Sequence, residues 1–250
     1  KRDGTVDLEH LRTLLRRDTV LVAVCAVDSE LGTVQPIRRI AELLREFPNC
    51  RLHVDATQAV GKTELPLDGA DTVSVAPHKF YGLNGSGLLL KKSGLVLEPQ
   101  IHGGGAQERG GTPALALAVS IEAALRLALE RQEDRICHVR KLNERLRTAL
   151  LSYPKVRFNS PENAVPHILN LSVEGVKGTV FQRVLSEQGV CVSVKTACSS
   201  DGAPSRAVFA VSGDRRRALS SWRISLSHLT TGDEIEEFLR IFDLCYHRYA

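Results

Sequence analysis

The chain has 250 residues, of which 43% are hydrophobic and 25% charged, a composition typical of globular rather than disordered or fibrous proteins. Its 33 basic and 29 acidic residues leave a net charge of +4, which is too small to favour nucleic acid as the main partner. We expect no membrane association, because no apolar run approaches the roughly 18 residues of a membrane-spanning helix and no signal peptide opens the chain. Six cysteines without CxxC spacing indicate reduced thiols and a cytoplasmic location.

Strands and helices alternate in the first third of the chain. The pattern predicts an amphipathic helix over 6–15, a buried apolar strand over 19–27, and a helix over 36–47 that Pro36 opens. Two further strands are predicted at 51–54 and 72–76. This order of elements predicts an α/β fold with a mostly parallel sheet.

An acidic residue and a lysine stand at the ends of these last two strands. Asp55 follows the strand 51–54, and Lys79 comes shortly after the strand 72–76. In an open parallel sheet a ligand binds beyond the carboxyl ends of the strands, so we expect both side chains to face one crevice. Taken alone, each has a simpler interpretation, since aspartate is a common turn residue and a lysine near a strand end usually extends into water.

A long helical region separates the two halves of the chain. Thr112 is predicted as its N-cap and Pro113 as its first residue, and helical composition continues to Leu151. Its richness in alanine and leucine predicts burial on more than one side. We therefore divide the chain into a large domain (1–112), a connecting helical region (113–151) and a small α+β domain (152–250).

Short strands and helices alternate in the small domain. Strands are predicted at 156–159, 168–171, 189–194 and 222–226, with helices over 179–188 and after a capping box of Thr231 and Glu234. The run Asp214-Arg215-Arg216-Arg217 is interpreted as a solvated loop, with a patch for an acidic partner protein as the alternative. The glycines at 102–105 predict a loop.

One cysteine lies in a polar loop after an apolar segment, in the stretch Lys195-Thr196-Ala197-Cys198-Ser199-Ser200. Structural cysteines are normally packed among apolar residues, and we expect Cys25 and Cys191 to be packed in this way within strands. Lys195 would favour the thiolate form of Cys198, which is the nucleophilic form. A lone loop cysteine more often has no function, so the residues alone leave both interpretations open.

Six motifs occur in one order along the chain: HVDATQAVGK, APHKFYGLNGSG, IHGGG, RGGT, TACSS and SSWRISLS. Together they resemble the cysteine desulfurase and selenocysteine lyase group of the class V aminotransferase family, whose members use pyridoxal 5'-phosphate (PLP). The resemblance covers almost the whole chain from Val6 onward. It implies the aspartate aminotransferase-like fold of PLP-dependent transferases, with a mostly parallel sheet in the large domain and a smaller α+β C-terminal domain.

The resemblance also implies a role for individual residues around the cofactor. Lys79 matches the lysine that forms the Schiff base with PLP, and His78 matches the neighbour that helps to hold PLP and to move protons. Asp55 matches the carboxylate that keeps the pyridine nitrogen protonated, which makes the ring an electron sink. Gln58 matches the donor to the phenolic oxygen of the ring. Thr112 matches the residue that reaches the PLP phosphate of the partner subunit in a homodimer.

Two further residues match the substrate side of the reaction. Arg223 matches the arginine that holds the substrate carboxylate, a role that suits a planar bidentate donor. Cys198 matches the nucleophile that attacks the sulfur of L-cysteine, leaves L-alanine and carries a persulfide to an acceptor protein, as in iron–sulfur cluster assembly.

The chain also departs from the family pattern. Ala76 stands where the family has a phosphate-binding serine, and Asp28-Ser29 replaces paired asparagines. The front segment of the family, with a phosphate-binding threonine turn and the histidine that stacks on the ring, has no counterpart, so we expect this chain to hold PLP poorly. Selenocysteine lyase, a plain aminotransferase, and an incomplete or split homologue that acts as an interaction partner in sulfur transfer remain as alternatives.

Overall fold

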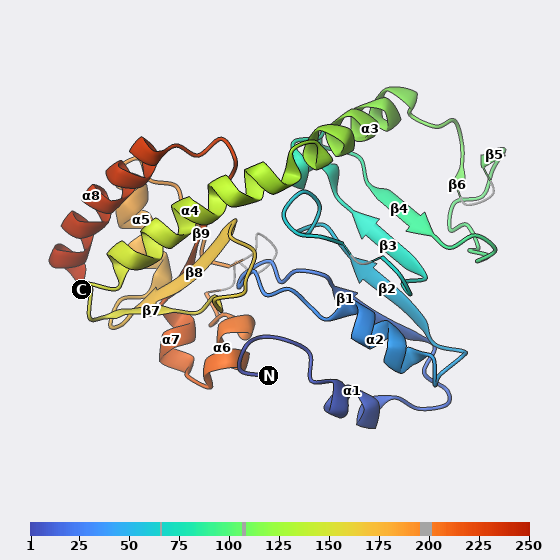
Figure 1. The fold of residues 1–250 in the computed structure, drawn as a ribbon, viewed down its shortest axis with the longest axis horizontal. Coiled ribbons are helices and arrows are strands. Elements are labelled where there is room, and N and C mark those ends of the chain that lie inside the picture. Colours follow the sequence, from blue (N-terminus) through green and yellow to red (C-terminus); the bar gives the residue numbers. More distant parts are fainter. Residues whose placement is uncertain (66, 107–108, 196–201) are drawn as a thin grey trace. The chain divides into compact units, whose positions relative to one another are not determined.

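The computed structural model describes residues 1–65, 67–106, 109–195 and 202–250 (Figure 1). The chain divides into two compact units. The parallel-sheet unit consists of residues 8–26 and 36–132, and the C-terminal unit consists of residues 1–7, 27–35 and 133–250. The domain bounds expected from the sequence stay a prediction.

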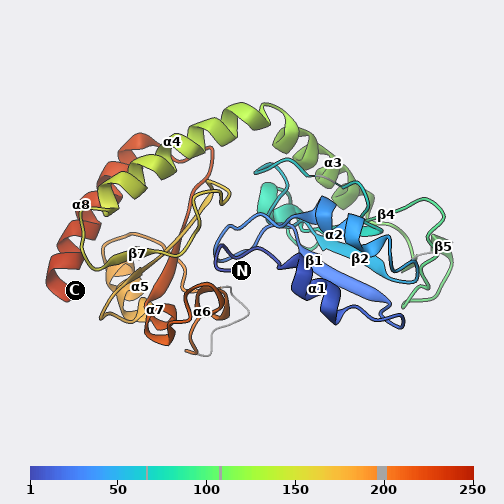
Figure 2. The same ribbon diagram turned by 60° about the horizontal axis from the view of Figure 1, so that its bottom comes forward.

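A four-stranded sheet forms the centre of the parallel-sheet unit. Its strands lie in the order β1 (Leu21–Cys25), β2 (Arg51–Asp55), β3 (Thr72–Val75) and β4 (Leu88–Lys91). The first three are parallel and β4 is antiparallel to β3, which confirms the predicted α/β fold with a mostly parallel sheet. Two helices, α1 (Leu8–Leu14) and α2 (Ile37–Leu44), contact each other, and α2 lies against β2 (Figure 1 and Figure 2).

Helix α2 forms where the sequence predicts it, because its apolar residues recur on one face. That face is buried and consists of Ile37, Ile40, Leu43 and Leu44. Pro36 precedes the first helical turn as the N-cap residue, so its missing N–H removes no helical hydrogen bond.

The first strand differs from the prediction. β1 spans Leu21–Cys25, and its side chains alternate between exposed and partly buried instead of being buried throughout. Among the described residues β1 pairs only with β2, so it lies at an edge of the sheet. Cys25 is exposed, and the expectation that it is packed in an apolar interior is therefore wrong.

The long helical region is two helices, α3 (Leu115–Leu129) and α4 (Gln132–Leu150). Arg131 separates them with a φ of 53°, a left-handed conformation that an α-helix cannot contain. The N-cap of α3 is Ala114, without a side-chain hydrogen bond. The prediction of Thr112 as the N-cap is therefore wrong.

Helix α3 is also more exposed than its composition predicts. Its buried side chains are Ala124 and Ala128, whereas Leu115 is 74% and Val119 58% exposed. The alanine face packs against the 3₁₀ helix η1 (Pro77–Phe80). Burial on more than one side is therefore wrong for α3, because among the described residues its only buried side chains are Ala124 and Ala128.

The C-terminal unit is built on an antiparallel sheet of β7 (Val156–Phe158), β8 (Ile168–Val173) and β9 (Ser221–Ser225). Its main core also includes side chains of α4, α5 (Gly178–Glu187) and α8 (Gly232–Tyr249). Trp222 is fully buried there and stacks on Phe181 with ring centroids 5.4 Å apart. Gly178 is needed at this contact, because a Cβ would collide with the Ser221 carbonyl oxygen. The predicted capping box of Thr231 and Glu234 is present at the start of α8.

The two faces of β8 have different partners, as the alternation of its side chains requires. Leu169, Leu171 and Val173 belong to the main core. Ser172, on the opposite face, donates to the carbonyl oxygen of Arg217 in α7 (Arg215–Leu219). A small cluster of Leu31, Val208 and Ala218 joins α7 to α6 (Arg206–Ser212) and to the segment 27–35.

Two further predictions in this unit are wrong. Residues 189–194 form no strand, and only Ser193 makes an isolated bridge with Arg223; Cys191 is exposed in this irregular segment. Asp214 to Arg217 is not a loop, because the Asp214 side chain accepts from the N–H groups of Arg216 and Arg217 and so caps α7. Among the described residues, no helix combines the length and the apolar character that a membrane crossing needs.

Candidate functional site

Asp55 stands at the carboxyl end of β2, where the sequence places it. Its Oδ1 accepts from the backbone N–H of Thr57 at 2.9 Å, a local turn that fixes the exposed carboxyl group. The ring of His53 contacts two hydroxyl groups of β3, Thr72 Oγ1 at 2.8 Å and Ser74 Oγ at 3.2 Å. These contacts support the register that pairs Asp55 with Ser74, so the ends of β2 and β3 lie side by side.

The lysine follows β3 on a tight turn. In η1 the side chains of Pro77 and Phe80 are buried while those of His78 and Lys79 are exposed. Gly82 makes this packing possible, because a Cβ there would lie 2.7 Å from the Cβ of Pro77. The apolar residues thus anchor the turn, which follows β3 just as Asp55 ends the adjacent parallel strand β2. That the side chains of Asp55 and Lys79 face one crevice stays a prediction.

Gln58 lies in the turn after β2 and has a partner that the sequence did not suggest. The Lys62 Nζ donates to Gln58 Oε1 at 2.8 Å. An ammonium group has only donors, so the oxygen of the amide must face Lys62. The NH₂ group of Gln58 is therefore left to donate elsewhere. The only sequence signal is the spacing of four residues between Gln58 and Lys62 within HVDATQAVGK.

The two glycine-rich motifs before Thr112 come together. β5 (Gly105–Ala106) pairs with β6 (Arg109–Gly110) in a short antiparallel ribbon, where the sequence predicts only a loop. The N–H of Gly111 also donates to the carbonyl oxygen of Gly104 at 2.9 Å. Thr112 follows this ribbon and is exposed. Its predicted contact with a partner subunit stays a prediction.

Arg223 is held on β9 by polar contacts on both sides of its guanidinium. Nη1 donates to the carbonyl oxygen of Ser29 at 2.6 Å, and Nε donates to Ser225 Oγ at 3.2 Å. Burial lowers the pKa of this guanidinium, and the nearby carboxyl groups of Glu30 and Asp28 act in the opposite direction. Arg223 is thus a half-buried cation of fixed orientation, which suits the binding of a carboxylate.

The two acidic residues beside Arg223 have structural partners of their own. Asp28 Oδ1 accepts from the N–H groups of Glu30 and Leu31 at 2.9 and 2.6 Å and so shapes the turn at 28–32. Glu30 Oε2 accepts from the hydroxyl group of Ser205 at 2.6 Å. The replacement of the family's asparagines by Asp28-Ser29 therefore places an aspartate in the turn, whereas the group of Ser29 that contacts the arginine is its backbone carbonyl, which any residue would supply.

The remaining predicted residue, Cys198, lies outside the described residues. Lys195, the last described residue before it, has a φ of 92°, a costly conformation for a residue with a side chain.

The predicted site residues are divided between the two units. Asp55, Gln58, His78 and Lys79 all lie at or shortly after the carboxyl ends of β2 and β3 in the parallel-sheet unit, whereas Arg223 belongs to the C-terminal unit. Within residues 1–65, 67–106, 109–195 and 202–250, no group of three or more His, Cys, Asp and Glu side chains could hold a metal ion.

Comparison with known proteins gives one consistent result. The family described as aminotransferase class-V matches residues 1–238. A NifS/IcsS protein homolog of Lactobacillus delbrueckii subsp. bulgaricus is 34% identical over 100% of this chain and 67% of its own length. Cysteine desulfurase IscS of Mannheimia succiniciproducens is 37% identical over 94% of this chain and 60% of its own length. A solved NifS-like protein is 31% identical with a TM-score of 0.88, and the match covers 97% of this chain and 66% of that one.

Proposed function

Because the chain belongs to the class V aminotransferase family, whose cofactor is PLP, we propose that it carries the cofactor and substrate residues of a cysteine desulfurase. The observation that supports the proposal is the position of Asp55 at the end of β2 and of Lys79 in the turn η1, which follows the adjacent parallel strand β3. The chain spans about 60 to 67% of the length of the curated relatives that it matches, and its activity, substrate and partners are therefore proposed.

The residues at this edge of the sheet fit PLP in charge and in hydrogen bonding. Lys79 offers a primary amine for the aldehyde carbon, and Asp55 offers a carboxylate for the protonated pyridine nitrogen. Gln58 offers the N–H groups that Lys62 leaves free, which suit the phenolic oxygen of the ring. When bound, PLP supplies an electron sink for a carbanion at the substrate Cα. We assign to His78, which is exposed beside Lys79, the roles of holding the cofactor and moving protons.

On the substrate side, we assign the carboxylate of L-cysteine to Arg223, which the Ser29 carbonyl group orients. The Cys198 thiolate attacks the substrate sulfur and forms a sulfur–sulfur bond. The carbon–sulfur bond breaks, its electron pair stays on carbon, and protonation of that carbon yields L-alanine. Cys198 is left as a persulfide, and the sulfur then passes to an acceptor protein.

We also propose a homodimer in the cytoplasm. The exposed apolar residues Leu115 and Val119 of α3 support a dimer, because apolar surface of this kind marks interfaces, and Thr112 lies close to them in the sequence. The cysteines at positions 25, 50, 137, 191 and 245 form no disulfide bond among the described residues, which supports a reducing compartment.

The cofactor assignment is tested by absorbance. Protein mixed with PLP should develop a band near the edge of the visible range, which borohydride abolishes and which Lys79→Ala lacks. Lys141→Ala, which changes an exposed lysine of α4, serves as the control and should keep the band. If wild-type protein never shows the band, the enzyme assignment fails and the alternative of an incomplete partner protein gains support.

The reaction assignment is tested by products. With L-cysteine and a small thiol as acceptor, we expect alanine and sulfide from wild-type protein and a loss of both in Cys198→Ala. Sulfide release that persists in Cys198→Ala would exclude the persulfide mechanism while leaving the cofactor assignment intact. Release of selenide from L-selenocysteine without release of sulfide from L-cysteine would favour selenocysteine lyase.

A further inference from the structure

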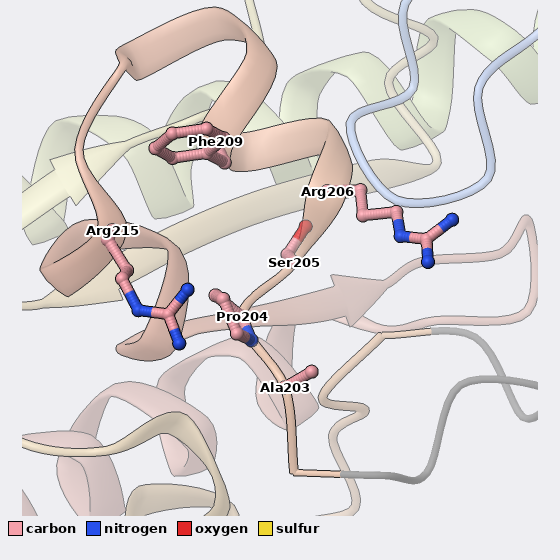
Figure 3. Close-up of a pocket in the computed structure, with 6 residues that line it drawn as sticks. All are labelled: Ala203, Pro204, Ser205, Arg206, Phe209 and Arg215. Carbon is pink, nitrogen blue, oxygen red and sulfur yellow. The ribbon is translucent and has the colours of Figure 1, made fainter.

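One arginine of α6 and one of α7 help to line a hollow on the surface of the C-terminal unit. The hollow has a volume of about 310 Å³ and is lined by Ala203, Pro204, Ser205, Arg206, Phe209 and Arg215 (Figure 3). Arg206, Arg215 and Arg216 are exposed, and we call these three residues the arginine surface. The proposed reaction uses none of them.

Among the described residues, no salt bridge neutralises the positive charge of the arginine surface. The segment 203–219 contains four arginines and one acidic residue, Asp214. The carboxyl group of Asp214 accepts from backbone N–H groups of α7, and the guanidinium of Arg217 turns inward to Asn159 and Phe158. For Arg206, Arg215 and Arg216, no ion pair with another described residue is found. Within the described residues, these three exposed cations therefore have no competing ion-pair partner.

The wall of the hollow is held in place before any partner binds. Ser205 is 1% exposed, donates its hydroxyl to Glu30 Oε2 at 2.6 Å, and accepts from the N–H of Val208 at 3.1 Å. Its own N–H donates to the carbonyl oxygen of Ala218 at 3.2 Å, which links the start of α6 to α7. A surface of fixed shape binds with a smaller loss of conformational entropy than a flexible one.

The arrangement of the side chains indicates the chemistry of the partner. Figure 3 shows Arg215 extending toward Pro204, while Arg206 extends away from Arg215 on the other side of Ser205. Phe209, which is 49% exposed, adds an aromatic side chain to the hollow. A single small anion cannot use both arginines and also cover the ring. An extended protein segment with acidic side chains on both sides of an apolar residue can do so.

We propose that the arginine surface docks an acidic segment of a protein partner. We identify this partner as the sulfur acceptor, because Ala203 follows Cys198 by only five positions in the sequence. This identification rests on the proposed function. Complementary charge at such a surface accelerates the encounter and selects the partner.

The probe for the test is a fluorescent peptide of repeated Glu-Glu-Leu triplets, and a Lys-Lys-Leu peptide is the negative control. By fluorescence anisotropy, the full chain should bind the acidic peptide, and Arg206→Glu combined with Arg215→Glu should weaken binding by at least about tenfold. The matched control is Arg39→Glu with Arg45→Glu, which reverses two exposed arginines of the other unit and should leave binding unchanged. Raising NaCl from about 0.05 to 0.5 M should weaken wild-type binding.

Three results would overturn the proposal: no binding of the acidic peptide to wild-type protein, equal binding by the Arg206/Arg215 variant, or equally tight binding of a single-stranded oligonucleotide of the same charge. Arg206→Gln combined with Arg215→Gln repeats the test by removing the two positive charges instead of reversing them. Circular dichroism verifies that each variant is folded. Sulfide release to a small thiol should be unchanged in these variants. If the PLP band is absent while charge-dependent binding persists, the docking surface stands and only the identification of the sulfur acceptor fails.

Discussion

A single lysine decides which way the amide of Gln58 faces. On the proposed function, the NH₂ group of Gln58 donates to the cofactor, and Lys62, which is not among the predicted site residues, positions that amide by holding its Oε1 at 2.8 Å. Lys62→Met should weaken PLP binding by about fivefold, the effect of one hydrogen bond worth about 1 kcal/mol. Lys62→Arg, whose side chain can still donate to Gln58 Oε1, should keep the affinity for PLP of the wild type.

The measurement for Lys62 is a titration of the protein with PLP, followed by the absorbance band of the bound cofactor. The pH dependence of that band gives a second readout, because a misplaced amide no longer stabilises the charged phenolic oxygen. If Lys62→Met and wild type have the same affinity and the same pH profile, Lys62 does not orient Gln58 toward the cofactor.

The pKa of Tyr153 predicts how the free energy of unfolding changes at high pH. Burial, and then its hydrogen bond to Asp243 Oδ1 at 2.8 Å, raise the pKa of Tyr153 to about 12, whereas an unfolded tyrosine ionises near about 10. Below pH 10 both states keep the proton. Between about pH 10 and 12 the unfolded state loses it first, so the free energy of unfolding falls as the pH rises.

Tyr153→Phe tests this sign. The variant lacks the hydroxyl group, so its free energy of unfolding does not include the decrease that ionisation of Tyr153 causes at high pH. The difference in the free energy of unfolding between wild type and variant should therefore shrink from about pH 9 to about pH 11.5. Urea denaturation followed by circular dichroism measures the difference at each pH. A constant difference across that range would show that Tyr153 ionises alike in both states.

At the scale of elements, a buried polar network attaches α7 to the sheet of the C-terminal unit. Asn159 Nδ2 donates to Asn170 Oδ1 at 2.8 Å and to Ser172 Oγ at 2.9 Å, and Asn159 Oδ1 accepts from Arg217 Nε at 2.6 Å. One side chain thus joins β7, β8 and α7. The network holds Arg217 of α7 against the sheet, while Arg215 and Arg216 of the same short helix are exposed to solvent.

Asn159→Leu should lower the free energy of unfolding by about 2 to 4 kcal/mol, because it leaves a half-buried arginine and buried polar groups without their partner. Urea denaturation measures this loss. Asn163→Leu, which changes an exposed asparagine of the same unit, should change stability by less than about 0.5 kcal/mol. Equal effects of the two substitutions would mean that the network contributes little to the attachment of α7.

At the scale of the whole molecule, the chain divides into two compact units. The only tryptophan of the chain, Trp222, is buried in the core of the C-terminal unit, so its fluorescence reports on that unit alone. We expect the urea transition seen by tryptophan fluorescence to lie above the first transition seen by circular dichroism, because the parallel-sheet unit exposes many of its large apolar residues. Coincident transitions would show that the units unfold together.

Much of the candidate site could be predicted from the sequence. The six motifs predicted the family, which the match over residues 1–238 confirms. The positions of Asp55 and Lys79 at strand ends follow from apolar periodicity and from the rule that places ligands there. The pairing of Gln58 with Lys62 could not be predicted in the same way, because it depends on the side-chain conformations of a turn.

The sequence by itself determined the family, the mostly parallel sheet and the capping of α8, because these depend on local patterns and on motif order. Only the tertiary structure decided which apolar segments are buried. β1 and α3 read as interior elements, yet one lies at a sheet edge and the other packs through a narrow alanine face. It also decided that residues 27–35 belong to the C-terminal unit, where Ser29 orients Arg223. Burial and long-range pairing depend on which surfaces meet, and no local pattern encodes that choice.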